Sequence, residues 1–515
     1  MLVSKRTGGP PPIVYILGVV AVSLGFWNFK DTLFSWSQQP LAVISGDTND
    51  LVILGDTFSG YSIFRSSDFN EELEQSGLSL RFENEFDQAE RAARLEKGNA
   101  DLIVTTLDQY LKHQPDGQIV GLIDRTVGAD AVVLNTPQYS TLTSLNDLSQ
   151  LVAQGQPLSL AYAADTPSEF LAQVLDIRFD GFNLADFNQL KVAEASEAWE
   201  TLQDPSQNIA VAVLWEPFVS QARDQGHTVV LSSQDAPNAI LDVIVASDDV
   251  IQDDPEKLTD LLSTYYRRMD QAARDNSQLK ALIQTDGGLS PTQADLVIDG
   301  IDFFTSVEAG RWMDDGTLEK RIAATAAILV LSGQLPEVPL ANELYSDRFI
   351  ADAVANTQSL IQLVQADDPE LAKFLTGEAD AAPPQAQLTA EAIQSSQPIG
   401  DLEVRGKVTF GTGSAAIAAE GQQTLTQLAT EINEFNTETV AIRVIGHTSK
   451  TGTATLNQRL SQQRAEAVVQ YLKSQAVNHN ILAEGKGFNE PLSGIAANDP
   501  RNQRTEIRLV RINQE

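Results

Sequence analysis

A turn and the helix that follows it hold the residues whose types and spacing best fit a ligand site. Residues 446–464 read Gly-His-Thr-Ser-Lys-Thr-Gly-Thr-Ala-Thr-Leu-Asn-Gln-Arg-Leu-Ser-Gln-Gln-Arg, directly after the apolar stretch 440–445. A helix that begins at Asn457 places one set of residues on a single face, at spacings of three and four: Asn457, Leu460, Ser461, Arg464 and Val468. The hydroxyls of the turn and the guanidinium of Arg464 can therefore share a small polar ligand.

This stretch resembles the OmpA-like peptidoglycan-binding domain, whose pattern is Gly-His-Thr-Asp, then Asn-x-x-Leu-Ser, then Arg-Ala. Ser449 stands where the family has its ligand-binding Asp. In that family the Arg pairs the carboxylate, and the Asp the ammonium, of diaminopimelate in the peptide stem. The peptidoglycan-binding residues that the resemblance implies here are Thr448, Ser449, Asn457 and Arg464. The alternative role for Arg464 is an ordinary surface ion pair.

The charge of the chain excludes some partners. Its 515 residues include 70 acidic and 35 basic side chains, which give a formal net charge of −35. Such a chain repels nucleic acid and anionic lipid at long range, so neither is an expected partner. The chain has no cysteine, which excludes disulfides and thiolate metal sites. Its length predicts two or three domains.

The N-terminus predicts a membrane anchor. Lys5 and Arg6 precede an apolar run, and the next charge is Lys30. We expect a cytoplasmic tail at 1–12, a single transmembrane helix at 13–29 and a stalk at 30–48, because basic residues keep that end in the cytoplasm. The helix then crosses a bacterial inner membrane once, and the remaining chain lies in the periplasm. A cleaved signal peptide is the alternative, although no small-residue cleavage site follows the run.

Strands alternate with helical segments from residue 51 to about 350, which predicts an α/β fold with largely parallel sheets. The rhythm restarts after Leu134, so we expect two lobes. Their predicted bounds are about 49–134 with 240–350 for lobe 1 and about 135–239 for lobe 2. The layout, with segments 98–104, 128–134, 144–148 and 213–218, resembles periplasmic solute-binding proteins of the nitrate/sulfonate/taurine type. The resemblance implies a two-lobed, type II-like fold, a small polar solute and an ABC permease as a further partner.

Ligands of open α/β sheets bind outside the carboxyl ends of strands. The candidate cleft residues at such ends are Asp56, Thr57, Ser59, Thr105, Thr106, Thr166, Ser168, Trp215 and Glu216, and Asp242 is a further candidate that brings negative charge near the proposed cleft. Thr166 can present a helix N-terminus to an anion or only cap its helix. Asp56 can bind an amine or stabilise its turn, and Trp215 can be a ligand platform or core. If the acids face the cleft, a cationic or zwitterionic ligand fits better than nitrate.

The C-terminal third predicts a linker and a small domain. Residues 351–400 are rich in Ala, Gln and Asp, with a Pro-Pro pair, and predict a flexible linker. Residues 401–515 predict a small α/β sandwich of the OmpA-like type. Its expected elements are strand 407–410, helix 420–434, strand 440–445, helix 457–474, and strands 481–488 and 504–511.

No pattern in the sequence predicts catalysis. The four histidines have neither the i, i+4 pairing nor the spacing of metal ligands, and neither a P-loop nor a Gly-x-Ser-x-Gly elbow occurs. We therefore expect no enzyme activity, cofactor or metal. The working hypothesis is an anchored envelope protein that captures a solute and is tethered to peptidoglycan. The alternative is an envelope scaffold whose binding lobes are degenerate or sense a protein, and an enzyme on the same fold is a weaker one.

Overall fold

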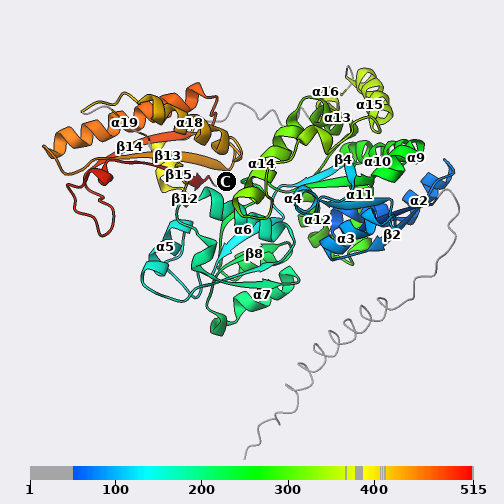
Figure 1. Cartoon of the computed structure of the whole chain (residues 1–515), viewed down its shortest axis with the longest axis horizontal. Helices are drawn as coiled ribbons and strands as arrows, with labels where there is room; N and C mark the ends of the chain where they lie inside the picture. The colour runs from blue at the N-terminus through cyan, green and yellow to red at the C-terminus, as the bar shows by residue number, and fades with distance from the viewer. Residues whose placement is uncertain are drawn as a thin grey trace, which may run out of the picture. The chain divides into compact units, whose positions relative to one another are not determined.

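The computed structural model describes residues 50–365, 368–376, 387–405, 408, 410 and 413–512. The predicted tail, anchor and stalk (1–48) lie outside the described residues. Within the described ranges, no helix is both long enough and apolar enough to cross a bilayer. The described residues form three β-sheets, and Figure 1 labels many of the strands and of the helices around them.

Lobe 1 is built on a six-stranded sheet in the order β11-β4-β10-β3-β1-β2. Its strands are β1 (Asp50–Gly55), β2 (Ser79–Asn84), β3 (Leu102–Thr106), β4 (Gly117–Thr126), β10 (Leu241–Ser247) and β11 (Ile301–Phe303). Strands β1, β2 and β3 are parallel, whereas β10 runs antiparallel to β3 and β4. All residues of β3 and β10 are buried, because helices cover both faces of such a sheet.

The helices of lobe 1 come from two separate stretches of the chain. The first stretch gives η1 (Ser59–Arg65), α2 (Ser67–Glu74), α3 (Gln88–Glu96) and α4 (Leu107–His113). The second gives α9 (Asp248–Asp253), α10 (Pro255–Arg274), α11 (Ser277–Asp286), α12 (Pro291–Asp299), α13 (Ser306–Asp314), α14 (Thr317–Leu331) and η4 (Ala341–Glu343). The chain therefore leaves lobe 1 after β4 and returns at β10.

Lobe 2 is built on a five-stranded sheet in the order β7-β6-β8-β5-β9. Its strands are β5 (Asp130–Leu134), β6 (Ser159–Ala163), β7 (Asn188–Val192), β8 (Ile209–Trp215) and β9 (Thr228–Ser232). Its helices are α5 (Leu145–Ala153), α6 (Pro167–Arg178), η2 (Leu184–Asp186), α7 (Ala195–Gln203), η3 (Pro205–Gln207) and α8 (Phe218–Asp224). The predicted two-lobed α/β architecture is confirmed. The sheets are mixed rather than largely parallel, because β5 runs antiparallel to β8 and β9 as β10 does to β3 and β4.

The crossing between the lobes differs from the predicted boundary at Leu134. Strand β5 belongs to the sheet of lobe 2, where Val132 lies opposite Val213 of β8 and Leu231 of β9. Lobe 2 therefore begins near Asp130. Strands β4 and β5 are both apolar and only residues 127–129 separate them, so the hydrophobic pattern could not locate the crossing.

The segment predicted as a linker contains regular structure in its described part. It holds α15 (Ala351–Val364), α16 (Pro369–Thr376), α17 (Ala390–Ser395) and β12 (Gln397–Asp401). Helix α15 packs against α10 and α13, and the hydroxyl of Thr357 donates to the buried carboxylate of Asp270. Its apolar contacts therefore join it to lobe 1, which composition alone could not indicate. Residues 377–386, which include the Pro-Pro pair, lie outside the described residues.

The C-terminal domain has a four-stranded sheet in the order β12-β15-β13-β14. Strands β13 (Val440–His447) and β14 (Ile481–Gly487) are parallel, and β15 (Thr505–Arg511) is antiparallel to β13. Helices α18 (Ala419–Ile432) and α19 (Ala454–Ser474) pack side by side, and η5 (Pro500–Asn502) precedes β15 (Figure 1). Of the predicted strand 407–410, residues 407 and 409 lie outside the described residues.

The C-terminal domain packs against lobe 2. The amide of Asp180 donates to the carbonyl of Asp401 (3.0 Å), and the amide of Glu403 donates to the carbonyl of Arg178 (2.8 Å). Arg511 of β15 forms an ion pair with the buried Asp235, next to β9. The edge of the C-terminal sheet is therefore joined to lobe 2 by backbone hydrogen bonds as well as by charge.

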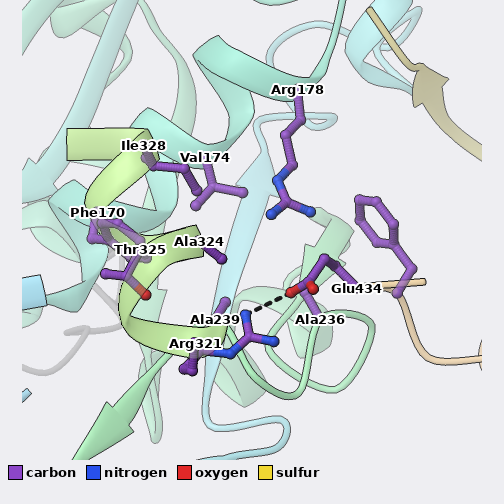
Figure 2. A pocket seen from close by; sticks show the side chains of 11 residues that line it. Phe170, Val174, Arg178, Ala236, Ala239, Arg321, Ala324, Thr325, Ile328 and Glu434 are labelled. Carbon is purple, nitrogen blue, oxygen red and sulfur yellow. Dashed lines mark hydrogen bonds and ion pairs between the residues drawn. The ribbon is translucent and has the colours of Figure 1, made fainter. Parts of the chain in front are cut away.

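A cavity of about 20 Å³ lies at this junction (Figure 2). Side chains of α6 and α14 line it, together with Phe435, which follows α18. Arg321 of α14 forms an ion pair with Glu434 (2.5 Å), drawn as the dashed line in Figure 2. The Phe435 ring meets Phe179 edge-to-face at 6.1 Å, so an aromatic contact closes the apolar side of the junction.

Candidate functional site

Close packing of α19 on the C-terminal sheet positions the predicted peptidoglycan site. A Cβ at Gly446 would collide with the carbonyl oxygen of Ser461, so only glycine lets β13 approach the helix. The hydroxyl of Thr453 caps α19 by accepting from the amide of Leu456 (3.3 Å). Four members of the predicted helix face are buried: Asn457, Ser461, Arg464 and Val468.

Arg464 is a buried cation without an acidic partner. Its side chain donates from Nε to the carbonyl of Ser414 (3.1 Å) and from Nη1 to Oε1 of Gln503 (3.4 Å). The guanidinium also lies 4.9 Å from the centre of the Phe410 ring. Among the described residues it forms no ion pair, and burial lowers its pKa. These contacts do not fit the alternative of an ordinary surface ion pair, and they leave the charge available to a carboxylate ligand.

Gln503 joins Arg464 to Ser449. Its Nε2 donates to Oγ of Ser449 (3.2 Å), while its Oε1 accepts from Arg464. The motif of the turn and helix does not indicate Gln503. The available signal was the closing strand, because β15 runs antiparallel to β13 with Thr505 opposite Gly446, which returns the preceding residues to the turn.

The other two predicted residues have different roles. Asn457 donates from Nδ2 to the carbonyls of Thr451 (2.8 Å) and Thr453 (3.0 Å), so it holds the turn in place. Thr448 is buried, and its hydroxyl has no hydrogen-bond partner within the described part of the chain. The structure thus brings Ser449 and Arg464 together through Gln503 and places the free hydroxyl of Thr448 next in the turn.

The predicted cleft residues of lobe 1 are only partly available to a ligand. Asp56 accepts from the amide of Phe58 (2.9 Å) and pairs with the fully buried Arg91 (2.9 Å). Stabilisation of its own turn therefore explains Asp56 without a ligand. Thr105 donates to Gln88 (2.9 Å). Of the two other candidates that follow β1, Thr57 is exposed and Ser59 is half-buried.

The predicted residues of lobe 2 make local contacts. Thr166 accepts from the amide of Ser168 (3.2 Å) and so caps α6, while the buried hydroxyl of Ser168 has no partner among the described residues. Glu216 accepts from the amide (3.1 Å) and the hydroxyl (2.9 Å) of Ser220. Trp215 is half-buried at the end of β8. Capping therefore explains Thr166 and Glu216 without a ligand.

A row of polar side chains crosses three neighbouring strands of lobe 1. Asp242 on β10 lies opposite Thr106 on β3 and opposite Asp124 on β4. All three are buried, and Tyr61 donates its hydroxyl hydrogen to Asp242. Burial, followed by the charge of Asp302, raises the pKa of Asp124 well above its ordinary value of 3.8. Burial and then the charge of Asp124 do the same to the pKa of Asp242.

Asp124 was missed from the sequence. The apolar pattern predicted a strand at 120–122, whereas β4 continues to Thr126 and carries Asp124 at its carboxyl end. The same edge of the sheet holds the carboxyl ends of β1 and β3, as the parallel pairing requires. Extension of the predicted strand by two residues would have identified this carboxylate.

Acidic groups also meet from the two lobes. Burial, then the charges of Glu216 and Asp108, raises the pKa of Asp130 to about 7. Burial, then the charge of Asp56, raises the pKa of Glu194 in lobe 2. One cation bridges the lobes, because Lys112 of α4 pairs with Asp165. The region between the lobes is therefore strongly acidic.

Comparisons with known proteins identify the C-terminal domain. Residues 409–505 match the OmpA family. Outer membrane protein A of Shimwellia blattae is 35% identical over 101 residues, which are 19% of this chain and 42% of that protein. The probable lipoprotein YiaD of Escherichia coli (strain K12) is 38% identical over 111 residues, which are 21% of this chain and 50% of that protein. The chain thus carries a C-terminal OmpA-like domain and spans 42% and 50% of the length of these relatives.

Solved structures resemble the two-lobed region at low sequence identity. The periplasmic nitrate-binding protein NrtA from Synechocystis PCC 6803 has a TM-score of 0.48 and 12% identity, over 62% of this chain and 91% of that one. The alkanesulfonate-binding protein SsuA from Xanthomonas axonopodis pv. citri, bound to MOPS, has a TM-score of 0.45 and 15% identity, over 59% and 100%. The desulfurization enzyme DSZB has a TM-score of 0.42 and 12% identity, over 60% and 99%.

Proposed function

We propose that this chain binds peptidoglycan through its OmpA-like domain and captures a small polar solute between its two lobes. The observation that carries the first part is the buried guanidinium of Arg464, which no acidic side chain of the described residues pairs. A buried unpaired charge is costly, and a carboxylate ligand would compensate it with charge-assisted hydrogen bonds.

The ammonium of diaminopimelate would find a weaker partner in this chain. Ser449 offers a hydroxyl, which already accepts from Gln503, and it supplies no negative charge. Loss of a charge-assisted contact costs roughly 1.5–3 kcal/mol when nothing replaces it. The proposed wall binding is therefore weaker than that of a family member with Asp at this position.

Ser449→Asp should strengthen binding of the full-length chain to purified sacculi by about tenfold or more, and Arg464→Ala should remove most of it. Pull-down over a range of sacculus concentrations measures both changes. Arg459→Ala is the matched control, because Arg459 is an exposed arginine on the same helix. Unchanged binding by Arg464→Ala, with the fold retained, would show that the wall contacts lie elsewhere.

Solute capture is the second part of the proposal. Strand ends of both lobes meet an acidic region, and the chain crosses between the lobes after β4 and again before β10. Closure about two such crossings would enclose a solute without bond chemistry. The local contacts of Thr166 and Glu216 favour the alternative of a scaffold with degenerate lobes. Native mass spectrometry of the freshly purified chain distinguishes solute capture from a scaffold, because only a solute-binding protein would retain a ligand. Co-purification with an ABC permease would extend solute capture to import.

Residues 13–29 anchor the chain in the inner membrane under this proposal, with the lobes in the periplasm. The support is the uncharged run after Lys5 and Arg6. N-terminal sequencing of protein from isolated membranes should find the original N-terminus intact. A first residue beyond Lys30, on protein recovered from the soluble fraction, would replace the anchor with a cleaved signal peptide.

A further inference from the structure

Asp124 is a fully buried carboxyl group that the described residues leave without a hydrogen bond. Its exposed fraction is 0%, and neither Oδ1 nor Oδ2 has a hydrogen-bond partner in the described part of the chain. A Cβ at Gly60 would collide with Oδ2, so η1 can cover this carboxylate only with glycine at that position. Burial of this carboxyl group costs more free energy than burial of an apolar residue of similar size, and the fold nevertheless retains it.

The neighbours of Asp124 form a ready-made set of acceptors. Asp242 and Thr106 continue the row across β10 and β3. Residues directly opposite each other in a sheet point to the same face, with their Cβ atoms about 4.5–5.5 Å apart. The side chain of Thr106 is also buried, and its hydroxyl lies near the buried carboxyl group of Asp108. Two carboxyl groups and one hydroxyl therefore stand side by side at the carboxyl end of the sheet.

The nearby basic side chains already have acidic partners. Arg91 pairs with Asp56, and Arg125 pairs with Asp302 and Glu308. The charge of the row is thus not neutralised by a direct ion pair to Asp124 or Asp242 within the described residues. Carboxyl groups supply no positive charge to a nitrate or sulfonate ion, whereas a cation at this end of the sheet would stabilise their ionised forms.

We infer that the solute captured between the lobes carries a protonated amine, and that Asp124, Asp242 and Thr106 hold its ammonium group. This inference rests on the proposed solute capture. An ammonium has three donors and no acceptor, and its positive charge would favour the ionised forms of Asp124 and Asp242, in which both carboxylates accept. Because η1 of lobe 1 covers the row in this conformation, binding requires η1 to move away from the sheet when the lobes part.

The test uses the dialysed full-length chain in thermal-shift assays at pH 8. Putrescine, spermidine, L-lysine and γ-aminobutyrate form one panel, and propionate, ethanesulfonate and nitrate form the other. At least one amine should raise Tm, and Asp124→Asn should weaken its binding at least tenfold. Asp260→Asn, the same charge change at an exposed position of α10, should bind like the wild type. Thr106→Val replaces threonine with a side chain of similar shape and should weaken amine binding several-fold. This variant tests the site if Asp124→Asn does not fold.

Each other outcome overturns either the ammonium inference or solute capture itself. Binding of the anions, unaffected by Asp124→Asn, would overturn the ammonium inference and leave solute capture intact. A Tm shift with Mg²⁺ or Ca²⁺ in place of the amines, or a co-purified compound without an amine, would do the same. If neither panel binds and native mass spectrometry of the freshly purified chain detects no ligand, solute capture itself is wrong.

Discussion

At pH 8, Asp130→Asn should be more stable than the wild type, by up to roughly 4 kcal/mol. Burial, then the charges of Glu216 and Asp108, raises the pKa of Asp130 from its ordinary 3.8 to about 7 in the folded chain. The unfolded chain loses this proton near pH 4. The wild type is therefore most stable below pH 4, loses stability between about pH 4 and 7, and changes little above pH 7 from this group.

Calorimetry of the full-length wild type and variant from pH 4.5 to 8.5 measures this effect. The two stability curves should nearly meet at the acidic end and separate as pH rises, because asparagine does not titrate. Asp116→Asn removes an exposed carboxyl directly before β4 and should leave the curve unchanged. Parallel curves for Asp130→Asn and the wild type would mean that Asp130 is ionised throughout.

Phe435→Ala should destabilise the chain by about 3–5 kcal/mol and weaken the docking of the C-terminal domain on lobe 2. The ring is 3% exposed, meets Phe179 edge-to-face and lies 5.8 Å from the guanidinium of Arg178. Its removal enlarges the cavity shown in Figure 2 and leaves Arg178 without its aromatic neighbour.

Differential scanning calorimetry should show an earlier transition for the C-terminal domain of Phe435→Ala. Phe435→Leu keeps most of the volume and should lose much less stability. Phe86→Ala is the matched surface control, since Phe86 is 53% exposed, and should stay within about 0.5 kcal/mol of the wild type. A Phe435→Ala transition identical to that of the wild type would show that this interface does not stabilise the chain.

The fold was predictable where residue patterns are strong and local. The C-terminal elements β13, α19, β14 and β15 were expected within a few residues, because long apolar periods and glycines bound them. Strand β7 was missed because its residues, Asn-Gln-Leu-Lys-Val, are polar and mostly exposed at a sheet edge. Strand β12 was missed because its pairing partner β15 lies far away along the sequence.

The sites were predictable to the level of residue type. The resemblance to OmpA-like domains indicates Ser449 and Arg464, but Gln503, which joins them, depends on antiparallel pairing that the motif does not reveal. Asp242 was named from its place at a strand, whereas its neighbour Asp124 was hidden by an apolar run. Which acids face one another depends on strand order, which local sequence patterns do not specify.

The hydrogen bonds between Asp180 and Asp401 and between Arg178 and Glu403 have a mechanical consequence. If the C-terminal domain is fixed to the cell wall, any load on it reaches lobe 2 through these bonds and through the pair of Arg511 with Asp235. Several of these bonds must shear together before the domain separates. Under the proposed wall binding, tension on the C-terminal domain would therefore be transmitted directly to lobe 2.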